Sequence, residues 1–221
     1  MRDGWVEAKL GDVVNIINGG TPSTKEENYW GGEIVWITTT ELTAFDGKKV
    51  DFSKRTITQD GLDSGPVRLV RAGTTLVGTT ATIGTCAMAG CDLTFNQQIS
   101  GLVPNTVDID DDFLFYFIQY IKPILEGLSA GTSFKRISTN VLKSVSIIYP
   151  PIEEQKRIVD LLSSIDSYIN IMSKQGVKTL ENVSLIGTTA KLRSALMHDL
   201  LSGQHVIPTS YDTKLSRQQC S

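Results

Sequence analysis

Pro150-Pro151-Ile152-Glu153-Glu154-Gln155 opens the stretch of sequence that decides the fold. Neither proline fits inside a helix, although Pro151 suits a helix start, so the pair marks a boundary. The two glutamates favour the N-terminal end of a helix dipole, and Gln155 can reach back to a free backbone N–H. We therefore expect a first domain over residues 1–149 and a helical region over residues 150–203.

Beyond the prolines, apolar residues recur in steps of four and three, which is the spacing of a heptad seam. The seam consists of Ile158, Leu162, Ile165, Ile169, Met172, Val183, Ile186, Ala190, Met197 and Leu200. A single helix from about Ile152 to Ser202, with Gly203 as its C-cap, would be about 75 Å long at about 1.5 Å per residue. The preceding globule, with a gyration radius near about 15 Å, cannot cover that length. The sequence therefore predicts a long coiled-coil-like helix that faces a helix of another chain.

Gly176, Thr179 and Arg193 interrupt the seam, and Gly176 leaves an alternative open. Glycine costs about 1 kcal/mol in a helix interior. A break there would give two shorter helices, folded back as a hairpin, although we expect the single helix. Residues 204–221 have no periodicity, and we expect a flexible tail.

Residues 1–149 have the pattern of a mixed α/β globule, so the predicted fold class is α+β. Three β-branched or aromatic runs predict strands at 34–37, 74–77 and 145–149. Asp110-Asp111-Asp112 precedes an apolar run and predicts a helix start, with the helix running to about Glu126 and bent or interrupted near Pro123. Residues 138–143 suggest one or two further helical turns.

Composition argues against a membrane or secreted protein, and the net charge weighs against a DNA-binding protein. No stretch of about 18 apolar residues occurs, so we expect no membrane span, and the N-terminus shows no signal peptide, which favours the cytoplasm. The three cysteines match no common metal pattern, and we expect reduced thiols. The 24 Asp and Glu outnumber the 21 Lys and Arg, giving a net charge of −3. DNA binding would therefore need local basic clusters or a partner.

The sequence lacks the motifs of amino-methyltransferases, of nucleotide-binding enzymes and of common nucleases. Adjacent prolines occur only in Tyr149-Pro150-Pro151-Ile152, which lacks the flanking residues of an amino-methyltransferase motif. No G-x-G-x-x-G turn is available to cradle a nucleotide or a similar cofactor. No proline is followed by Asp, so the usual nuclease pattern is missing too. We expect no catalytic residues, no metal site and no enzyme.

A series of motifs carries a resemblance over residues 5–203. They are Trp5, Lys9-Leu10-Gly11-Asp12, Asn18-Gly19-Gly20-Thr21-Pro22-Ser23-Thr24-Lys25, Tyr29-Trp30-Gly31-Gly32, Ile34-Val35-Trp36-Ile37-Thr38-Thr39-Thr40-Glu41-Leu42, Phe95-Asn96-Gln97-Gln98-Ile99, Gly131-Thr132-Ser133-Phe134-Lys135-Arg136-Ile137, the stretch that opens at Pro150, and Leu196-Met197-His198-Asp199-Leu200-Leu201-Ser202-Gly203. In this order they resemble the specificity (S) subunits of type I restriction-modification systems.

The resemblance implies a subunit that makes and breaks no bonds and that recognises double-stranded DNA. S subunits of this family carry two target-recognition domains, each followed by a helix. The helices pair antiparallel and dock two methyltransferase (M) subunits, which restriction (R) subunits join. This chain resembles half a subunit, so we expect a homodimer or a fragment. No cofactor is expected on it, and S-adenosylmethionine is expected only on the partner M subunit.

Candidate DNA contacts are hydroxyl, amide and basic side chains in predicted loops, where such groups suit phosphate oxygens and base edges. They are Thr21, Pro22, Ser23, Thr24, Lys25, Thr38, Thr39, Thr40, Lys54, Arg55, Arg68, Arg71, Ser133, Lys135 and Arg136. An ordinary turn with surface hydroxyls, or a solvated loop, is the alternative for these stretches. The aromatic residues Tyr29, Trp30 and Trp36 fit a core better than base stacking. The amides of Asn96-Gln97-Gln98 are suited to reading adenine through paired hydrogen bonds, but we expect this run to tie a buried strand to a loop.

Two functions of different classes remain open. The first is a non-catalytic subunit that reads DNA and directs M and R subunits to a bipartite site. The second is a structural or interaction protein, such as the product of a silent half-subunit cassette, whose helix binds a partner without reading DNA. The acidic balance favours the second slightly.

Overall fold

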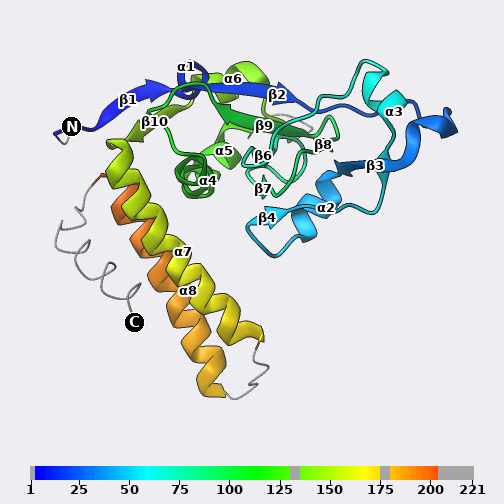
Figure 1. Cartoon of the computed structure of the whole chain (residues 1–221). Coiled ribbons are helices and arrows are strands. Elements are labelled where there is room, and N and C mark those ends of the chain that lie inside the picture. The colour runs from blue at the N-terminus through cyan, green and yellow to red at the C-terminus, as the bar shows by residue number, and fades with distance from the viewer. Residues whose placement is uncertain (1–2, 130–134, 175–179, 204–221) are drawn as a thin grey trace, which may run out of the picture. The chain divides into compact units, whose positions relative to one another are not determined.

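The chain forms two compact units in the computed structural model, which describes residues 3–129, 135–174 and 180–203 (Figure 1). One unit is Ala8–Ile147, and the other combines Met1–Glu7 with Ile148–Ser221. Both boundaries fall within strands, β1 (Val6–Lys9) and β10 (Ser146–Tyr149), which pair in a two-stranded sheet. We call Ala8–Ile147 the α/β unit and the other the helical unit.

A five-stranded sheet in the order β2-β9-β6-β7-β4 is the largest layer of the α/β unit. Its strands are β2 (Val14–Asn18), β4 (Lys49–Val50), β6 (Thr75–Gly78), β7 (Cys86–Ala89) and β9 (Ile99–Pro104). The pairings are antiparallel except that of β4 with β7, which is parallel. The strand predicted at 74–77 is confirmed one residue later, as β6.

A second sheet of three strands has the order β5-β3-β8, with β3 (Trp30–Ile37), β5 (Thr56–Ile57) and β8 (Thr94–Phe95). β3 pairs antiparallel with β5 and parallel with β8. The 3-10 turn η1 (Glu27–Tyr29) leads into β3. The predicted strands at 34–37 and 145–149 are therefore confirmed within β3 and β10.

Short helices lie in the connections between strands, among them α1 (Leu10–Val13), α2 (Thr39–Ala44), α3 (Gln59–Asp63) and α6 (Thr139–Ser144). Three of them begin after a hydroxyl side chain that accepts a hydrogen bond from a first-turn N–H, as N-caps do. These caps are Thr38, Thr58 and Ser138. The helical turns predicted near residues 138–143 are confirmed in α6.

The helix α4 (Asp111–Tyr120) is buried on every side. The Asp110 carboxylate caps it by accepting N–H groups from Asp112 and Phe113, so the predicted helix start is confirmed. Six consecutive residues, 113–118, are buried, which suits a helix that is apolar all round. The helix ends before Ile121, and α5 (Lys122–Leu128) follows with Pro123 in its first turn, so of the two predicted possibilities the interruption is the one observed.

Among the described residues of the α/β unit, two apolar clusters lie within the core beside the buried helix α4. The larger joins residues of both sheets with α2: Ile37, Leu42, Val50, Val70, Leu76, Ala87, Ala89, Leu93, Phe95 and Ile99. The smaller joins Trp36, Ile57 and Val67, with Trp30, Ile34 and Leu62 packed against it. The expectation that Trp36 is a core aromatic is confirmed, since this side chain is only 5% exposed.

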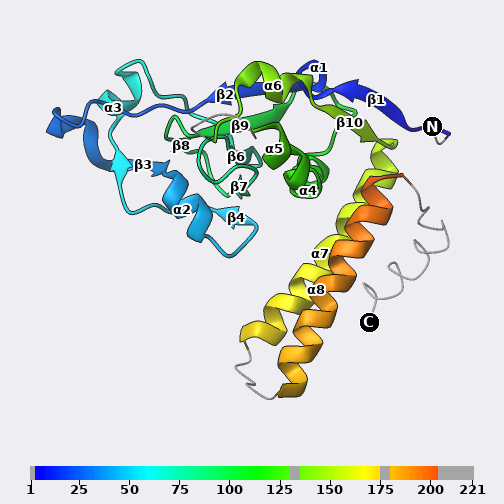
Figure 2. The same ribbon diagram turned by 180° about the vertical axis from the view of Figure 1, so that it is seen from behind.

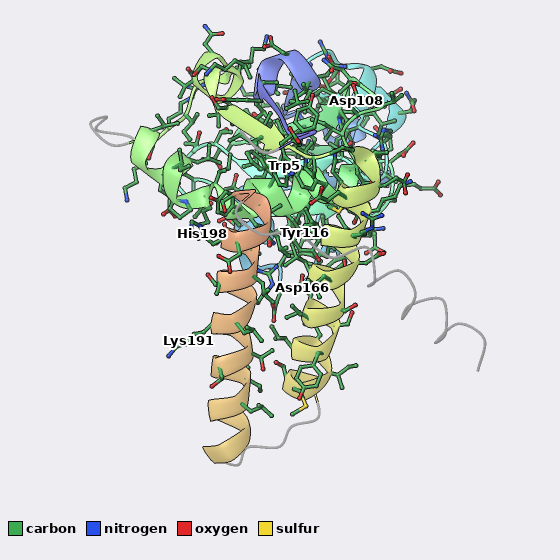
Figure 3. The ribbon with its side chains drawn as sticks, turned by 90° about the vertical axis from the view of Figure 1, so that its left-hand side faces the viewer. Trp5, Asp108, Tyr116, Asp166, Lys191 and His198 are labelled. Atoms are coloured by element: carbon green, nitrogen blue, oxygen red, sulfur yellow. The ribbon has the colours of Figure 1, made fainter. Side chains whose placement is uncertain are left out.

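The described part of the helical unit includes the helices α7 (Ile152–Lys174) and α8 (Leu180–Leu201), which pack against each other along their length (Figure 3). The predicted single helix is therefore wrong, and the hairpin alternative is the observed arrangement. An Arg193 guanidinium on α8 forms an ion pair with Asp166 on α7. The apolar seam of α7 therefore packs against α8 of the same chain, whereas the sequence predicted a helix of another chain. Gly176 and Thr179 lie outside the described residues.

Burial along the seam is uneven within this hairpin. Ile158, Leu162, Met197 and Leu200 are buried. By contrast, Ile165, Ile169, Met172 and Ile186 are half-buried and Ala190 is exposed, while the side chain of Val183 lies outside the described part. Folding back therefore removes only part of the predicted apolar stripe from solvent. Four larger apolar side chains, Tyr168, Ile171, Leu185 and Leu192, are 42% to 55% exposed.

Both ends of the hairpin follow the sequence signals closely. Pro151 lies just before α7, and the buried Gln155 amide reaches back over the first turn. Its Nε2 donates to the Pro150 carbonyl at 2.8 Å. This nitrogen therefore bonds a backbone carbonyl, whereas the sequence predicted that the Gln155 side chain reaches a free backbone N–H. Gly203 follows α8 with a φ of 72°, the left-handed conformation of a helix C-terminus. A Cβ there would also lie 3.3 Å from the Trp5 ring.

None of the helices, over the residues that the structure describes, has the length and apolar character needed to cross a membrane. The view from behind shows the same helices and sheets (Figure 2).

Candidate nucleic-acid interface

Side-chain hydrogen bonds join four segments of the α/β unit that are far apart in sequence. The Thr21 hydroxyl donates to Oε1 of Gln97 at 2.5 Å, and the Thr39 hydroxyl donates to Oδ1 of Asn96 at 3.1 Å. The hydroxyls of Thr43 and Thr82 lie 2.9 Å apart. These bonds connect the segment after β2, the helix α2, the loop 79–85 and the turn 96–98. We call this connected area the threonine surface.

Two grooves lie on the threonine surface and share Thr43, Ala81 and Thr82. One, of about 460 Å³, is lined by Thr39, Thr40, Thr43, Ala44, Ala81, Thr82 and Gln98. The other, of about 450 Å³, also contains the basic side chains of Lys122 and Lys135. Ala81 has a φ of 65°, in the left-handed region that residues with a Cβ rarely adopt. Such strain is held only where the surroundings determine it, and it is frequent at functional sites.

Thr38, Thr39 and Thr40 start a helix instead of the predicted loop, and only Thr40 is exposed. Thr38 and Glu41 form a reciprocal cap, in which each side chain bonds the other residue's backbone N–H. Glu41 also accepts from the backbone N–H of Lys54 at 2.6 Å, which fixes the segment after β4 against α2. Burial raises the pKa of Glu41, but the hydrogen bonds from Lys54 and Thr38 outweigh it, so the pKa lies below its ordinary value.

Two tryptophans hold the segment from Gly20 to Lys25. Trp36 donates from Nε1 to the Gly20 carbonyl at 2.9 Å, and Trp30 donates to the Ser23 carbonyl at 3.1 Å. The two rings meet edge to face with centroids 5.0 Å apart. Pro22 is buried, whereas Ser23, Thr24 and Lys25 are exposed. The exposed hydroxyls and the lysine therefore lie on a segment whose backbone is held by hydrogen bonds from the two tryptophans.

The Arg55 guanidinium lies against this tryptophan pair, 3.6 Å from the Trp30 ring centroid. The backbone carbonyl of Arg55 accepts a hydrogen bond from the Ser53 hydroxyl at 2.7 Å, and Oγ of Ser53 accepts one from the backbone N–H of Trp36 at 3.0 Å. Arg55 is exposed, and its guanidinium forms no hydrogen bond or ion pair with the residues that the structure describes. An arginine stacked in this way keeps its N–H edge available for phosphate or guanine.

The basic pair Lys135 and Arg136 adjoins the loop 79–85 through backbone contacts. Ala81 donates to the Lys135 carbonyl at 3.0 Å, Ile137 donates to the Thr79 carbonyl at 2.9 Å, and Thr80 bridges to Arg136. Both basic side chains are exposed and form no hydrogen bond or ion pair with described residues. Ser133, which was predicted beside them, lies outside the described residues.

Arg68 and Arg71 are bound within the protein. Arg68 donates to the carbonyls of Gly65 and Val67. Arg71 forms a two-pronged ion pair with Asp111, with N–O distances of 2.6 and 2.8 Å. This hydrogen-bonded pair raises the pKa of Arg71. The structure thus brings together the candidates at Thr21, Thr39, Thr40, Lys54, Lys135 and Arg136, but gives Arg68 and Arg71 other partners.

Sequence reasoning missed Thr43, the loop 79–85 and the exposed position of Gln97. The run Gly78-Thr79-Thr80-Ala81-Thr82 carries a signal, since a glycine followed by hydroxyl residues favours a tight loop with donors. In the described part of the chain, no group of three or more His, Cys, Asp or Glu residues is placed to hold a metal ion. Cys86 and Cys91 are half-buried and form no disulfide there.

Known proteins match this chain over most of its length. A family model described as the type I restriction modification DNA specificity domain matches residues 2–182. The type I restriction enzyme MjaIX specificity subunit of Methanocaldococcus jannaschii is 33% identical over 183 residues, which are 82% of this chain and 42% of that protein. The EcoR124I/EcoR124II specificity subunit of Escherichia coli is 27% identical over 186 residues, 78% of this chain and 44% of that protein.

Solved structures share the fold. The HsdS subunit of Thermoanaerobacter tengcongensis aligns with a TM-score of 0.63 at 22% identity, over 93% of this chain and 46% of that one. A chain from a study of assembly and conformational transition of the type I R-M system aligns with a TM-score of 0.65, also at 22% identity, over 91% and 46%. This chain therefore spans less than half the length of these relatives. On the family match and the identity to MjaIX together, the chain belongs to the type I restriction modification DNA specificity family.

Proposed function

We propose that this chain is a DNA-recognition subunit that performs no chemistry and directs methyltransferase and restriction subunits of a type I complex to a bipartite site. The observation that carries the proposal is the threonine surface together with nearby basic side chains, Arg55 and Lys135-Arg136, that form no hydrogen bond or ion pair with the described residues. Hydroxyl groups and uncommitted basic groups on one anchored surface are what phosphate and base-edge contacts require.

The candidate residues divide into two roles under this proposal. Direct contacts come from exposed side chains: Ser23, Thr24, Lys25, Thr40, Lys54, Arg55, Lys135 and Arg136. Supporting roles go to the side chains that are already hydrogen-bonded or buried, namely Thr21, Pro22, Thr38, Thr39, Arg68 and Arg71. Ser133 keeps its place as a candidate next to Lys135 in the sequence.

The negative net charge of the chain favours a complex in which partner subunits supply some of the DNA contacts. A chain with net charge −3 supplies few phosphate contacts beyond its local clusters. We propose that M subunits add the remaining contacts and carry S-adenosylmethionine, and that R subunits join through this M-S core. The family's name supports the DNA role, and the type I systems named for the relatives support the partners.

We further propose that two copies associate through their helical units to provide two recognition domains. The hairpin exposes four large apolar side chains, Tyr168, Ile171, Leu185 and Leu192. Exposed apolar groups of this kind on adjacent helices favour a partner. A two-fold pair would present the same reading surface twice and would therefore read the same short sequence on opposite strands.

The test is to purify the full chain with the M subunit of its system and to map the methylated sites across a genome. The expected site is an interrupted palindrome, with two inverted half-sites and an unread spacer. A continuous site would contradict the two-fold arrangement, and an asymmetric bipartite site would indicate pairing with a different specificity chain. The purified chain alone should transfer no labelled methyl group. Association with M without sequence preference would favour the interaction-protein alternative instead.

A further inference from the structure

Three consecutive amides, Asn96, Gln97 and Gln98, cross the threonine surface between β8 and β9, and the structure gives them different roles. Asn96 accepts the Thr39 hydroxyl through Oδ1 and donates from Nδ2 to Gln98 at 3.3 Å. Asn96 and Gln98 are both half-buried. Gln97 is exposed, and its Nε2 forms no hydrogen bond with the residues that the structure describes. The expected tying role therefore belongs to Asn96 and Gln98, and Gln97 stands apart.

The turn that carries Gln97 is held by hydrogen bonds on both sides. Ile99 donates to the Asn96 carbonyl at 3.1 Å, and Gln98 donates from its backbone to Oδ1 of Asn96 at 3.2 Å, closing an Asx turn. Asn96 donates to the Ile37 carbonyl at 2.9 Å, and Thr79 donates to the Gln98 carbonyl, also at 2.9 Å. Gln97 therefore projects from a backbone that is fixed before any ligand arrives, which lowers the entropy cost of binding.

Thr21 sets the direction of the Gln97 amide. Its hydroxyl donates to Oε1 at 2.5 Å, so the amide nitrogen, with two donors, faces away from this bond. A carbonyl oxygen has two acceptor sites, so Oε1 keeps one for a second donor. The outer edge of Gln97 thus offers one acceptor beside a donor. That pairing matches N6–H and N7 on the major-groove edge of adenine.

We propose that Gln97, oriented by Thr21, reads an adenine in the target sequence. The proposal rests on the proposed DNA-recognition function. It assigns the readout to a residue held by the core, whereas the basic residues around it supply phosphate contacts. The partner is a base edge because the outer edge of Gln97 carries no charge for phosphate and presents both hydrogen-bonding types side by side.

The test compares variants of the full chain, assembled with the M subunit, on a pool of DNA duplexes with a randomised stretch. Bound duplexes are sequenced for wild type, Gln97→Ala, Gln97→Glu, Thr21→Val and Thr21→Ser. The matched control is Gln59→Ala, which removes an exposed glutamine of α3 whose side-chain amide bonds Asp63. Thermal unfolding of each variant confirms that the fold is kept, since Gln97 is at the surface.

We expect Gln97→Ala to lower discrimination at one adenine position about fivefold to about 150-fold, with other positions unchanged. Gln97→Glu should also lose this preference, because a carboxylate cannot donate to N7. Thr21→Val should lower discrimination at the same position, and Thr21→Ser and Gln59→Ala should keep it.

Three outcomes would overturn the inference. In the first, Gln97→Ala weakens binding equally on all sequences, which assigns Gln97 to the DNA backbone. In the second, the selected sequence is unchanged in Gln97→Ala, which leaves Gln97 without a reading role. In the third, Thr21→Val behaves as wild type, which removes the orienting role of Thr21. If the wild-type complex itself selects no sequence, the proposed function fails, and this result is distinct from the other three.

Discussion

The guanidinium carbon of Arg55 lies 3.6 Å from the centroid of the Trp30 ring, whose own N–H holds the segment that contains Ser23. One aromatic side chain therefore orients a basic group and anchors a hydroxyl-bearing segment at the same time. The effect of the Arg55–Trp30 stack on DNA binding can therefore be measured separately from the effect of the positive charge of Arg55.

We predict that Arg55→Ala weakens DNA binding across all sequences and makes the salt slope of log affinity smaller by about 0.9, as loss of one phosphate contact does. Arg55→Lys should restore the slope but only part of the affinity, because a lysine does not reproduce the planar stack. Titrations at several salt concentrations measure both quantities. Lys156→Ala is the control, since Lys156 pairs with Glu153 on α7. An unchanged slope in Arg55→Ala would exclude a phosphate contact.

The pair Lys135 and Arg136 allows a test of two contacts together. Their side chains can be removed without loss of the backbone bonds to Thr79 and Ala81. The double alanine variant should reduce the salt slope by about 1.8 if both residues bind phosphate. If Arg136 reads guanine instead, the loss should be about 1–3 kcal/mol at one base position. Lys49→Ala, at an exposed lysine of β4, should bind as wild type.

The ion pair between Asp166 and Arg193 should stabilise the hairpin measurably. The two side chains are only 26% and 22% exposed, so each single alanine variant should lower the free energy of unfolding by about 1–3 kcal/mol. The double variant should cost less than the sum, with a coupling energy of about 0.5–3 kcal/mol. Urea unfolding of the four proteins measures it. Additive losses would show that the helices are held together without this pair.

Glu41 should make the α/β unit sensitive to acid. Its folded pKa lies below the ordinary value, so its stabilisation is complete above the unfolded pKa, near 4.5, and is lost as pH falls through the folded pKa. Glu41→Gln should lower stability at neutral pH by about 1–2 kcal/mol. The gap between wild type and variant should close on acidification. A gap that stays constant from pH 7 to about pH 3 would contradict this assignment.

Self-association should depend on the outer face of the hairpin. Ile171 and Leu192 are 54% and 55% exposed, so aspartate there disturbs the hairpin little but would bury a charge in an interface. The double variant should be monomeric by light scattering at micromolar concentrations at which wild type is dimeric. Ser194→Asp, at an exposed position of α8, is the control. Ile165 and Ile169 suit this test less well, because they are half-buried in the hairpin. A wild-type monomer would contradict the proposal directly.

The elements that local signals define could be predicted from the sequence. The aspartate cap of α4, the strands β3, β6 and β10 and the glycine after α8 each depend on residues within one or two turns. The hairpin could not be chosen over the single helix, because the heptad register is the same in both. The cost of about 1 kcal/mol for one glycine is small beside the burial that tertiary contacts decide.

The types of residue in the candidate site could be predicted from the sequence, but which of them contact one another could not. Arg71 has the composition of a DNA contact, yet Asp111, 40 residues away, holds it. For Gln97 the sequence left two roles open, adenine readout and tying a strand to a loop, and the hydrogen bond from Thr21, 76 residues away, could not be foreseen. Neither pairing leaves a periodic signal, since hydrogen bonds between distant segments depend on how the sheets are arranged.

The two boundaries of the α/β unit lie in the paired strands β1 and β10. The chain therefore leaves the helical unit and re-enters it at adjoining points. An inserted unit whose two ends adjoin can be replaced by a different unit of the same fold through two crossovers in the gene, with the hairpin left unaltered. The cross-linked threonine surface makes such whole replacement easier than change by single steps, because altering one side chain leaves its distant partner without a hydrogen bond. Diversity of target sequence in this architecture should therefore arise by genetic exchange of entire units.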